Sequence, residues 1–151
     1  LVVAVLTYVN EITFAQSTRR AQSARHSGDP IEEIIKDAQE FFFSDYFFIG
    51  LAIRVSGDDS TRRLKRDTQQ LTRQTRFSIE AAWLDTLISS GIPQQLASDV
   101  LALTLSVVRG FSLRMLMEKD PDQFSRLLGV WRKIVREYIA ASIPKKTKKR
   151  T

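Results

Sequence analysis

The chain has 151 residues, of which 43% are hydrophobic and 26% are charged, a composition typical of one globular domain. It contains no cysteine and one histidine, His26, so disulfides, cysteine zinc sites and multi-histidine metal sites are excluded. The net charge is +6, but five positive charges lie in residues 145–150 and the rest of the chain is close to neutral. The sequence therefore does not indicate that the main part of the chain is a basic, nucleic-acid-binding domain. We expect residues 143–151 to be a disordered basic tail.

The first third of the chain predicts three helices. The first covers residues 1–25 and ends at a Ser-Gly-Asp-Pro turn, where Gly28 is expected to be left-handed, Asp29 to be an N-cap and Pro30 to open the second helix. That second helix runs to about residue 43 and a third covers residues 46–55. The third is almost wholly apolar, so we expect it to be buried. A buried strand is the alternative, but no second strand exists to pair with it.

A long fourth helix is predicted over residues 61–89. Its first half is polar and basic, so we expect that half to project toward solvent, whereas its apolar second half should enter the core. Gly91 should follow its C-terminus and Pro93 should start the next helix.

Residues 94–142 predict two further helices, over 96–118 and 122–141, joined by a short break at Lys119-Asp120-Pro121. Each has two apolar faces, and one core cannot cover both of them. A short-looped hairpin of this kind is a candidate for half of an intermolecular four-helix bundle. The predicted fold is therefore all-α: an antiparallel bundle of about six helices over residues 1–142, whose last two helices form an intermolecular four-helix bundle.

Aromatic residues gather at positions 41–48, with Trp83 further along the chain. They can form solid core, or some of them can line an apolar cavity between the second, third and fourth helices. If there is a cavity, its candidate ligand-binding residues are the following: Phe43, Tyr46, Phe47, Gln74, Trp83, Phe111 and Met115.

Arg109 and Arg114 stand out because they lie in an apolar helix. They can snorkel or pair with Glu118 or Glu137, or they can recognise an anion inside a pocket or across a dimer. Between them, Gly110 costs about 1 kcal/mol relative to alanine, which a close helix crossing at a two-fold interface or the approach of a ligand would justify. The candidate residues of a dimer interface are the following: Val108, Gly110, Leu128, Trp131, Val135 and Ile139.

Catalysis is not expected, because the sequence has no nucleophile with an evident base, no glycine-rich phosphate loop and no metal-ligand spacing. We expect no cofactor and no metal. The longest mostly apolar run, residues 41–53, is shorter than the roughly 20 residues that a membrane span needs, so we expect no membrane partner and a cytoplasmic location.

The layout resembles the C-terminal ligand-binding and dimerisation domain of the TetR family of bacterial transcriptional regulators. Residues 1–6 look like the start of the helix that follows the family's DNA-binding headpiece. Residues 79–93 look like the long core helix and its exit. Residues 101–111, and Asp120-Pro121-Asp122 before a helix with Trp131, look like the two dimerisation helices and their connector.

This resemblance implies a homodimeric regulator, a repressor, in which a small hydrophobic effector shifts the population of two arrangements. Residues 1–25 would be the connecting helix from a helix-turn-helix headpiece, which would lie before Leu1 and is absent from this sequence. Operator DNA would be bound only through that headpiece. Two other hypotheses remain: a ligand-free helical interaction module with a solid aromatic core and, least favoured, an enzyme with a buried site in a helical bundle.

Overall fold

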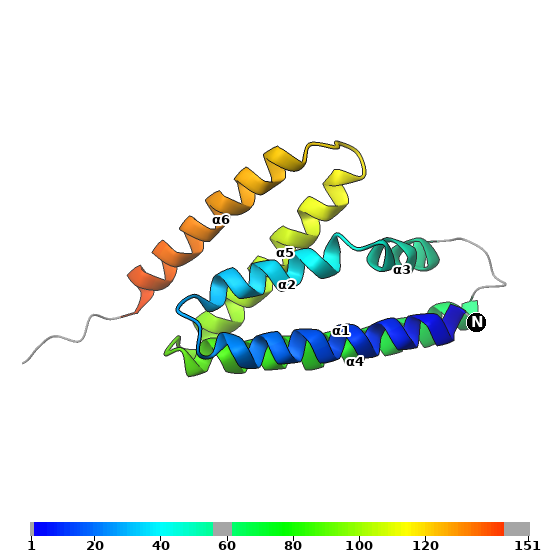
Figure 1. Cartoon of the computed structure of the whole chain (residues 1–151), viewed down its shortest axis with the longest axis horizontal. Helices are drawn as coiled ribbons and strands as arrows, with labels where there is room; N and C mark the ends of the chain where they lie inside the picture. The colour runs from blue at the N-terminus through cyan, green and yellow to red at the C-terminus, as the bar shows by residue number, and fades with distance from the viewer. Residues whose placement is uncertain (1, 56–61, 144–151) are drawn as a thin grey trace, which may run out of the picture.

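The computed structural model describes residues 2–55 and 62–143, which form six helices and no strand (Figure 1). The helices are α1 (Val2–Ala24), α2 (Pro30–Phe42), α3 (Asp45–Val55), α4 (Arg62–Ser89), α5 (Gln94–Met115) and α6 (Pro121–Ser142). The predicted all-α class is confirmed. The largest difference is at the C-terminus of α5, which ends at Met115 rather than at Glu118. The predicted basic tail lies outside the described residues beyond Ile143.

Helix ends follow the local sequence, with one exception. Asp29 accepts a hydrogen bond from the Glu32 N–H at 3.1 Å and caps α2, as predicted. Gly91 has a φ of +90° and follows α4, also as predicted. The expectation for Gly28 was wrong, because Gly91 is the one described glycine with positive φ. Instead, α1 ends in successive i→i+3 hydrogen bonds such as Ser27 N–H to Ala24 C=O, which need no left-handed residue.

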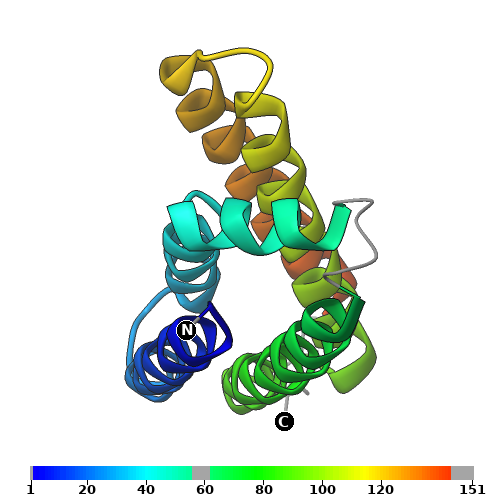
Figure 2. The ribbon, with the colours of Figure 1, turned by 90° about the vertical axis from the view of Figure 1, so that its right-hand side faces the viewer.

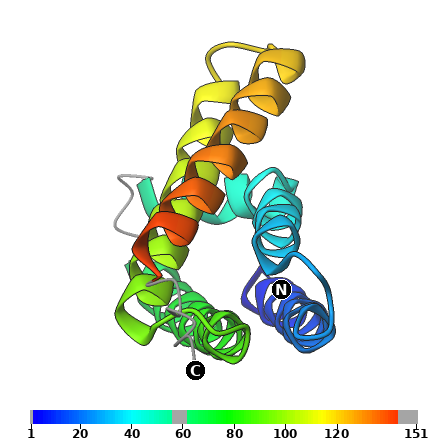
Figure 3. The same cartoon turned by 90° about the vertical axis from the view of Figure 1, so that its left-hand side faces the viewer.

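The longest helices, α1 and α4, lie side by side and run in the same direction (Figure 1). Near their C-terminal ends the Thr86 hydroxyl donates to the Ala21 carbonyl at 2.8 Å, which brings the two backbones close together. The neighbours in sequence, α1 with α2 and α5 with α6, run in roughly opposite directions (Figures 1 and 3). Two parallel helices thus form the base of the molecule, and α2 and the α5–α6 hairpin pack above it.

The core is centred on α2. Its stripe of isoleucines, Ile31, Ile34 and Ile35, is fully buried and belongs to one cluster with side chains of α4, α5 and α6. The acidic start of α2 also holds α6, because Arg132 Nε lies 2.7 Å from Glu32 Oε2 and Arg136 pairs with Asp29 and Glu32. These pairs join the α1–α2 turn to the C-terminal half of α6.

Helix α3 is less buried than its apolar sequence predicts. Phe47 and Gly50 are buried, but Tyr46 and Ile49 are about half exposed, at 51% and 49%. Figure 2 shows the reason: α3 crosses one end of the molecule, so only one of its sides meets other helices. The expectation of a fully buried helix was therefore wrong for its outer side.

Helix α5 is, within the described ranges, the one helix long and apolar enough to cross a membrane by length and composition. It packs against α2, α4 and α6, and it buries Thr104 and Ser112 as well as apolar residues. A core helix of a bundle has the same composition, so we interpret α5 as a bundle helix.

One buried carboxylate joins three helices. Asp37 of α2 accepts hydrogen bonds from Ser17 Oγ of α1 at 2.9 Å and from Trp83 Nε1 of α4 at 3.0 Å. Arg20 of α1 lies 3.1 Å from the same carboxylate and uses its other terminal nitrogen on Glu40. Burial raises the pKa of Asp37 above its ordinary value, and the bonds from Trp83, Ser17 and Arg20 oppose that rise only in part.

The raised pKa of Asp37 predicts how stability depends on pH. The folded protein binds the Asp37 proton more tightly than the unfolded chain does. The stability that this carboxyl contributes should therefore be greatest below the unfolded pKa of about 3.9 and should be lost as pH rises through the folded pKa. Urea unfolding should be measured for wild type and for Asp37→Asn from about pH 3 to about pH 7. The free energy of unfolding of wild type minus that of Asp37→Asn should decrease as the pH rises.

A wild-type advantage that grows with pH would contradict this assignment. Glu40→Gln is the control, since it removes the exposed partner of the same arginine and should cost no more than about 1 kcal/mol.

The backbone conformations of Gly91 and Gly28 predict how alanine substitutions there change the stability of the protein. Gly91→Ala should lower the free energy of unfolding by about 1–2 kcal/mol, because alanine is strained at positive φ. Gly28→Ala should be neutral or stabilising by up to about 1 kcal/mol, since an added Cβ meets nothing within 4 Å and φ is not positive there. Chemical denaturation of both variants measures the difference; equal losses would be inconsistent with this backbone.

Candidate functional site

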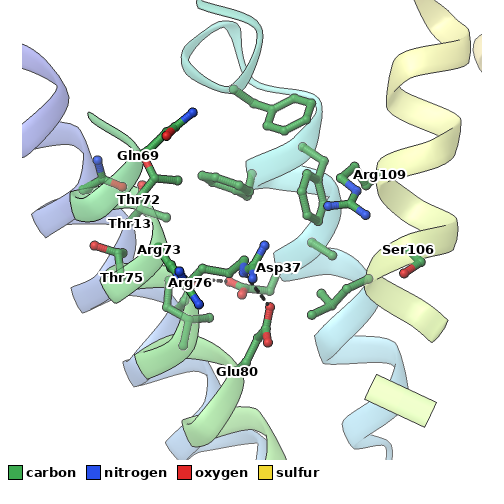
Figure 4. Close-up of a pocket in the computed structure, with 18 of the residues that line it drawn as sticks. Thr13, Asp37, Gln69, Thr72, Arg73, Thr75, Arg76, Glu80, Ser106 and Arg109 are labelled. Atoms are coloured by element: carbon green, nitrogen blue, oxygen red, sulfur yellow. Dashed lines mark hydrogen bonds and ion pairs between the residues drawn. The ribbon is translucent and has the colours of Figure 1, made fainter. Parts of the chain in front are cut away.

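A cavity of about 910 Å³, partly open to solvent, lies between α1, α2, α4 and α5 (Figure 4). Three small polar residues of α1 line one side: Asn10, Thr13 and Ser17. Helix α4 contributes a mostly polar wall, in which Ile79 joins Arg66, Gln69, Gln70, Thr72, Arg73, Thr75, Arg76 and Glu80. Helix α5 contributes four further residues: Ala102, Leu105, Ser106 and Arg109. Four helices thus surround one hollow, and the start of α3 covers part of it through Phe47.

The cavity has an apolar wall formed by α2 and α3. The rings of Phe42 and Phe47 meet edge to face with centroids 5.1 Å apart, and Phe41 lies 5.1 Å from Phe42 and 5.9 Å from Phe47. Ala38 continues this wall toward the base of α2. Rings packed edge to face in this way hold one another in place, so the wall is a fixed apolar surface.

The cavity also carries charge. Four arginines line it (Arg66, Arg73, Arg76 and Arg109), together with two carboxylates, Asp37 and Glu80. Arg76 pairs with Glu80 at 3.2 Å, and Asp37 is held by Ser17, Arg20 and Trp83. Both carboxylates therefore already have donors, and the charge left facing the hollow is positive.

The structure brings one of the seven predicted ligand-binding residues, Phe47, into this cavity. Tyr46 lines a smaller adjoining hollow of about 350 Å³ with Tyr8 and Ile12 of α1. Trp83 is buried behind the cavity floor, because its indole N–H is bonded to Asp37.

The other four lie elsewhere. Phe43 packs against the core, and Gln74 is exposed on α4 outside the cavity lining. Phe111 packs on Phe124 of α6 with ring centroids 5.8 Å apart. Met115 is the last residue of α5, also outside the cavity lining.

Sequence reasoning missed the polar sides of the cavity. The α1 residues that line it occur at positions 10, 13 and 17, which is the spacing of one helix face. The same is true of Gln69, Thr72 and Arg76 on the polar half of α4. These two polar stripes were detectable, but only the fold shows that they face the same hollow.

The predicted dimer residues divide into two groups. Val108, Leu128 and Val135 are buried within the single chain, at 0%, 1% and 3% exposure, and they pack in its own core. Trp131 and Ile139 are half-buried, and the Trp131 indole donates to Thr104 Oγ1 at 3.2 Å.

Gly110 is different. It is exposed, and an added Cβ there would meet nothing within 4 Å. The other apolar face of the α5–α6 hairpin is open: Leu103, Met117, Val130, Ile134 and Tyr138 are 45–88% exposed.

Among the residues with described positions, no group of three or more histidine, cysteine, aspartate or glutamate side chains could hold a metal ion. What the cavity offers is therefore an apolar wall, polar sides and positive charge. Such an arrangement can hold and orient a small molecule.

The chain is similar to the HTH-type transcriptional regulator CymR of Pseudomonas putida. The two are 32% identical over 140 residues, which cover 93% of this chain and 68% of the relative. No family model and no solved structure matches the chain. At this identity over nearly its whole length, the chain belongs to the family of HTH-type transcriptional regulators that CymR represents.

Proposed function

We propose that this chain is the effector-binding and dimerisation part of a TetR-like transcriptional repressor. A small hydrophobic effector would bind the cavity and change how a helix-turn-helix headpiece, joined through α1, binds its operator. The observation that carries the proposal is the cavity of about 910 Å³ between the helices of the bundle. Its volume lies within the range of about 300–1,000 Å³ that small-molecule sites occupy.

The TetR-like assignment rests on the order of the helices. A first helix packs along a long fourth helix, and the chain ends in a helical hairpin with an apolar outer face. The relationship to an HTH-type regulator supports the same class. Regulators of transcription act by binding DNA and not by catalysis, so we propose no enzymatic activity and a cytoplasmic location.

The cavity supports a mechanism by population shift. Asn10, Thr13 and Ser17 of α1 contribute to its lining, so an effector would contact the same helix that leads toward the headpiece. A ligand can shift an equilibrium only through different affinities for the two states. A bound effector would contact α1 on one side and α2, α4 and α5 on the others. If α1 moves relative to these helices, the contacts change, and the effector then has different affinities for the two states.

The exposed face of the α5–α6 hairpin supports a homodimer. Val130 and Ile134 of α6 and Leu103 of α5 are 45–53% exposed, so the other helices of the chain leave them largely uncovered. Gly110 lies on the same side of α5 as Leu103, with open space where a side chain would be. Two such faces related by a two-fold axis would form a four-helix bundle in which Gly110 permits close approach.

Substitutions in the proposed dimer face and in the core of the chain should have different effects. Ile134→Glu should weaken dimerisation at least about 100-fold while the helices remain folded, because a charge left unpaired in an apolar interface costs several kcal/mol. Leu128→Glu should instead unfold the protomer, since Leu128 is 1% exposed. Sedimentation and far-UV circular dichroism separate the two results. Wild type that is monomeric at micromolar concentration would refute the dimer.

Filling the cavity with a ligand or with a larger side chain tests whether it is the binding site. Wild type should gain about 2.7 kcal/mol of stability from a hydrophobic ligand at 100 times its dissociation constant, measured as a thermal shift. Ser106→Phe should abolish that shift, because Ser106 lines the cavity. Ser98→Phe is the matched control, since Ser98 is also an exposed serine of α5 but lies outside the lining.

If Ser98→Phe and Ser106→Phe lose the shift equally, the ligand binds elsewhere. A dimer that responds to no compound of a broad hydrophobic library would instead favour a ligand-free interaction module.

A further inference from the structure

We propose that a second copy of this chain closes the open side of the cavity along α5, so that each binding site is completed by the partner protomer at Ser106. The inference rests on the proposed dimer and on the proposed effector cavity, and it adds that the two are parts of one site. It depends on where the cavity-lining residues of α5 lie relative to the residues of the proposed dimer face.

The cavity is open along its α5 side. Of the four residues with which α5 lines it, Ala102, Ser106 and Arg109 are exposed and Leu105 is partly buried. Figure 4 shows Ser106 and Arg109 on α5 at this edge of the cavity. Residues that line an enclosed cavity are shielded from solvent, so the helices of a single chain leave this edge uncovered.

A second stripe of exposed residues runs along α5. Its members follow one another at steps of three, four and three residues, and none of them is charged: Leu103, Ser106, Gly110 and Leu113. Alternating steps of three and four residues are the spacing at which helices pack side by side in a bundle. This stripe is therefore the line along which a second helical hairpin can pack on α5.

Ser106 belongs to both surfaces of α5. It lies four residues after Ala102 and three before Arg109, so it shares a side of the helix with the cavity lining. It also lies three residues after Leu103 and four before Gly110, so it shares a side with the apolar stripe. A second copy packed on the stripe would therefore lie over the open edge of the cavity.

The middle of the stripe consists of two small residues, which permit a close approach. An added Cβ at Gly110 would meet nothing within 4 Å, so there is open space above its backbone. The Ser106 hydroxyl already donates to the Ala102 carbonyl at 2.8 Å, so its donor stays satisfied when a partner covers it. A partner helix can therefore approach α5 closely enough here to cover the cavity edge.

A second copy of the chain is the partner that fits this surface. Val130, Ile134 and Tyr138 of α6 are spaced by four residues and are 45–55% exposed, so α6 adds an apolar stripe to that of α5. Two such hairpins can pack like against like around a two-fold axis. Because a two-fold contact is repeated in both protomers, one dimer would contain two completed cavities.

The absence of cysteine from the sequence makes a direct test possible. Ser106→Cys introduces a single thiol, and its rate of reaction with iodoacetamide is measured with and without the dimer-breaking change Ile134→Glu. The thiol should react at least about 10-fold more slowly in the chain without Ile134→Glu, because the partner covers it. Ser23→Cys is the control, since Ser23 is an exposed serine of α1 outside the cavity lining. Its thiol should react equally fast in both backgrounds.

Binding of a neutral apolar dye, Nile red, tests whether the closure matters for a ligand. Wild type should bind the dye at least about 10-fold more tightly than Ile134→Glu does, because the open edge leaves a bound molecule partly in water. Since linkage is reciprocal, the dye should also strengthen dimerisation in sedimentation. Val55→Glu is the matched control: it places glutamate at an apolar residue that is 74% exposed, outside the hairpin and the cavity lining. It should bind the dye as wild type does.

Far-UV circular dichroism should show the same helix content in all variants. If the thiol at position 106 reacts equally fast with and without Ile134→Glu, while wild type is a dimer, the closure is wrong and the proposed dimer stands. If wild type and Ile134→Glu bind the dye equally tightly, the cavity is complete within one chain, so the closure is wrong and the proposed cavity stands. If wild type is monomeric at micromolar concentration, the closure and the proposed dimer are both overturned.

Discussion

The arrangement of this molecule depends on the buried carboxylate of Asp37. It lies on α2, and it receives donors from α1 on one side and from α4 on the other. A buried carboxylate with its donors removed would cost several kcal/mol, so the three helices are held at mutual positions that satisfy it. Because Asp37 also lines the cavity, the interaction that fixes the helices is part of the surface that a ligand would touch. The Asp37 carboxylate therefore both holds the helices together and forms part of the candidate site.

The cavity follows from the polarity of two helix faces. At their C-terminal ends α1 and α4 meet through small or buried residues such as Ala21, Ala24 and Thr86, so they pack closely. Further toward their N-termini the residues with which α1 and α4 line the cavity are mostly polar, including Asn10 and Gln69, so they offer little apolar surface to close the space. The bundle is thus dense at one end and hollow at the other, and the phenylalanines of α2 and α3 supply the apolar part of the hollow.

Local patterns predicted the elements far better than the site. Caps such as Asp29, the left-handed Gly91 and the apolar periodicities place all six helices within a few residues, because these effects act over one or two turns. The site combines residues from five helices, and no local pattern specifies which faces meet. Trp83 shows the difficulty: its size and polar tip suit a ligand wall, but its indole N–H is taken by Asp37, 46 positions away. Likewise, both apolar faces of α5 and α6 were visible in sequence, but only packing shows that Leu128 faces inward and Ile134 outward.

The positions of the polar contacts along α1 have a mechanical consequence. Polar contacts tie α1 to α2 and α4 through Ser17, Arg20 and Ala21, all in its C-terminal third, and this region could serve as a fulcrum if α1 tilts. The N-terminus of α1 lies ~22 Å further along the axis at 1.5 Å per residue, so a tilt of ~5° about the fulcrum displaces that end by ~2 Å. The cavity lining at Asn10 and Thr13 lies between the two points. In the proposed function, a ligand bound in the cavity would press on α1 partway along its length, and a domain joined to the N-terminal end of α1 would move further than the part of the helix that the ligand touches.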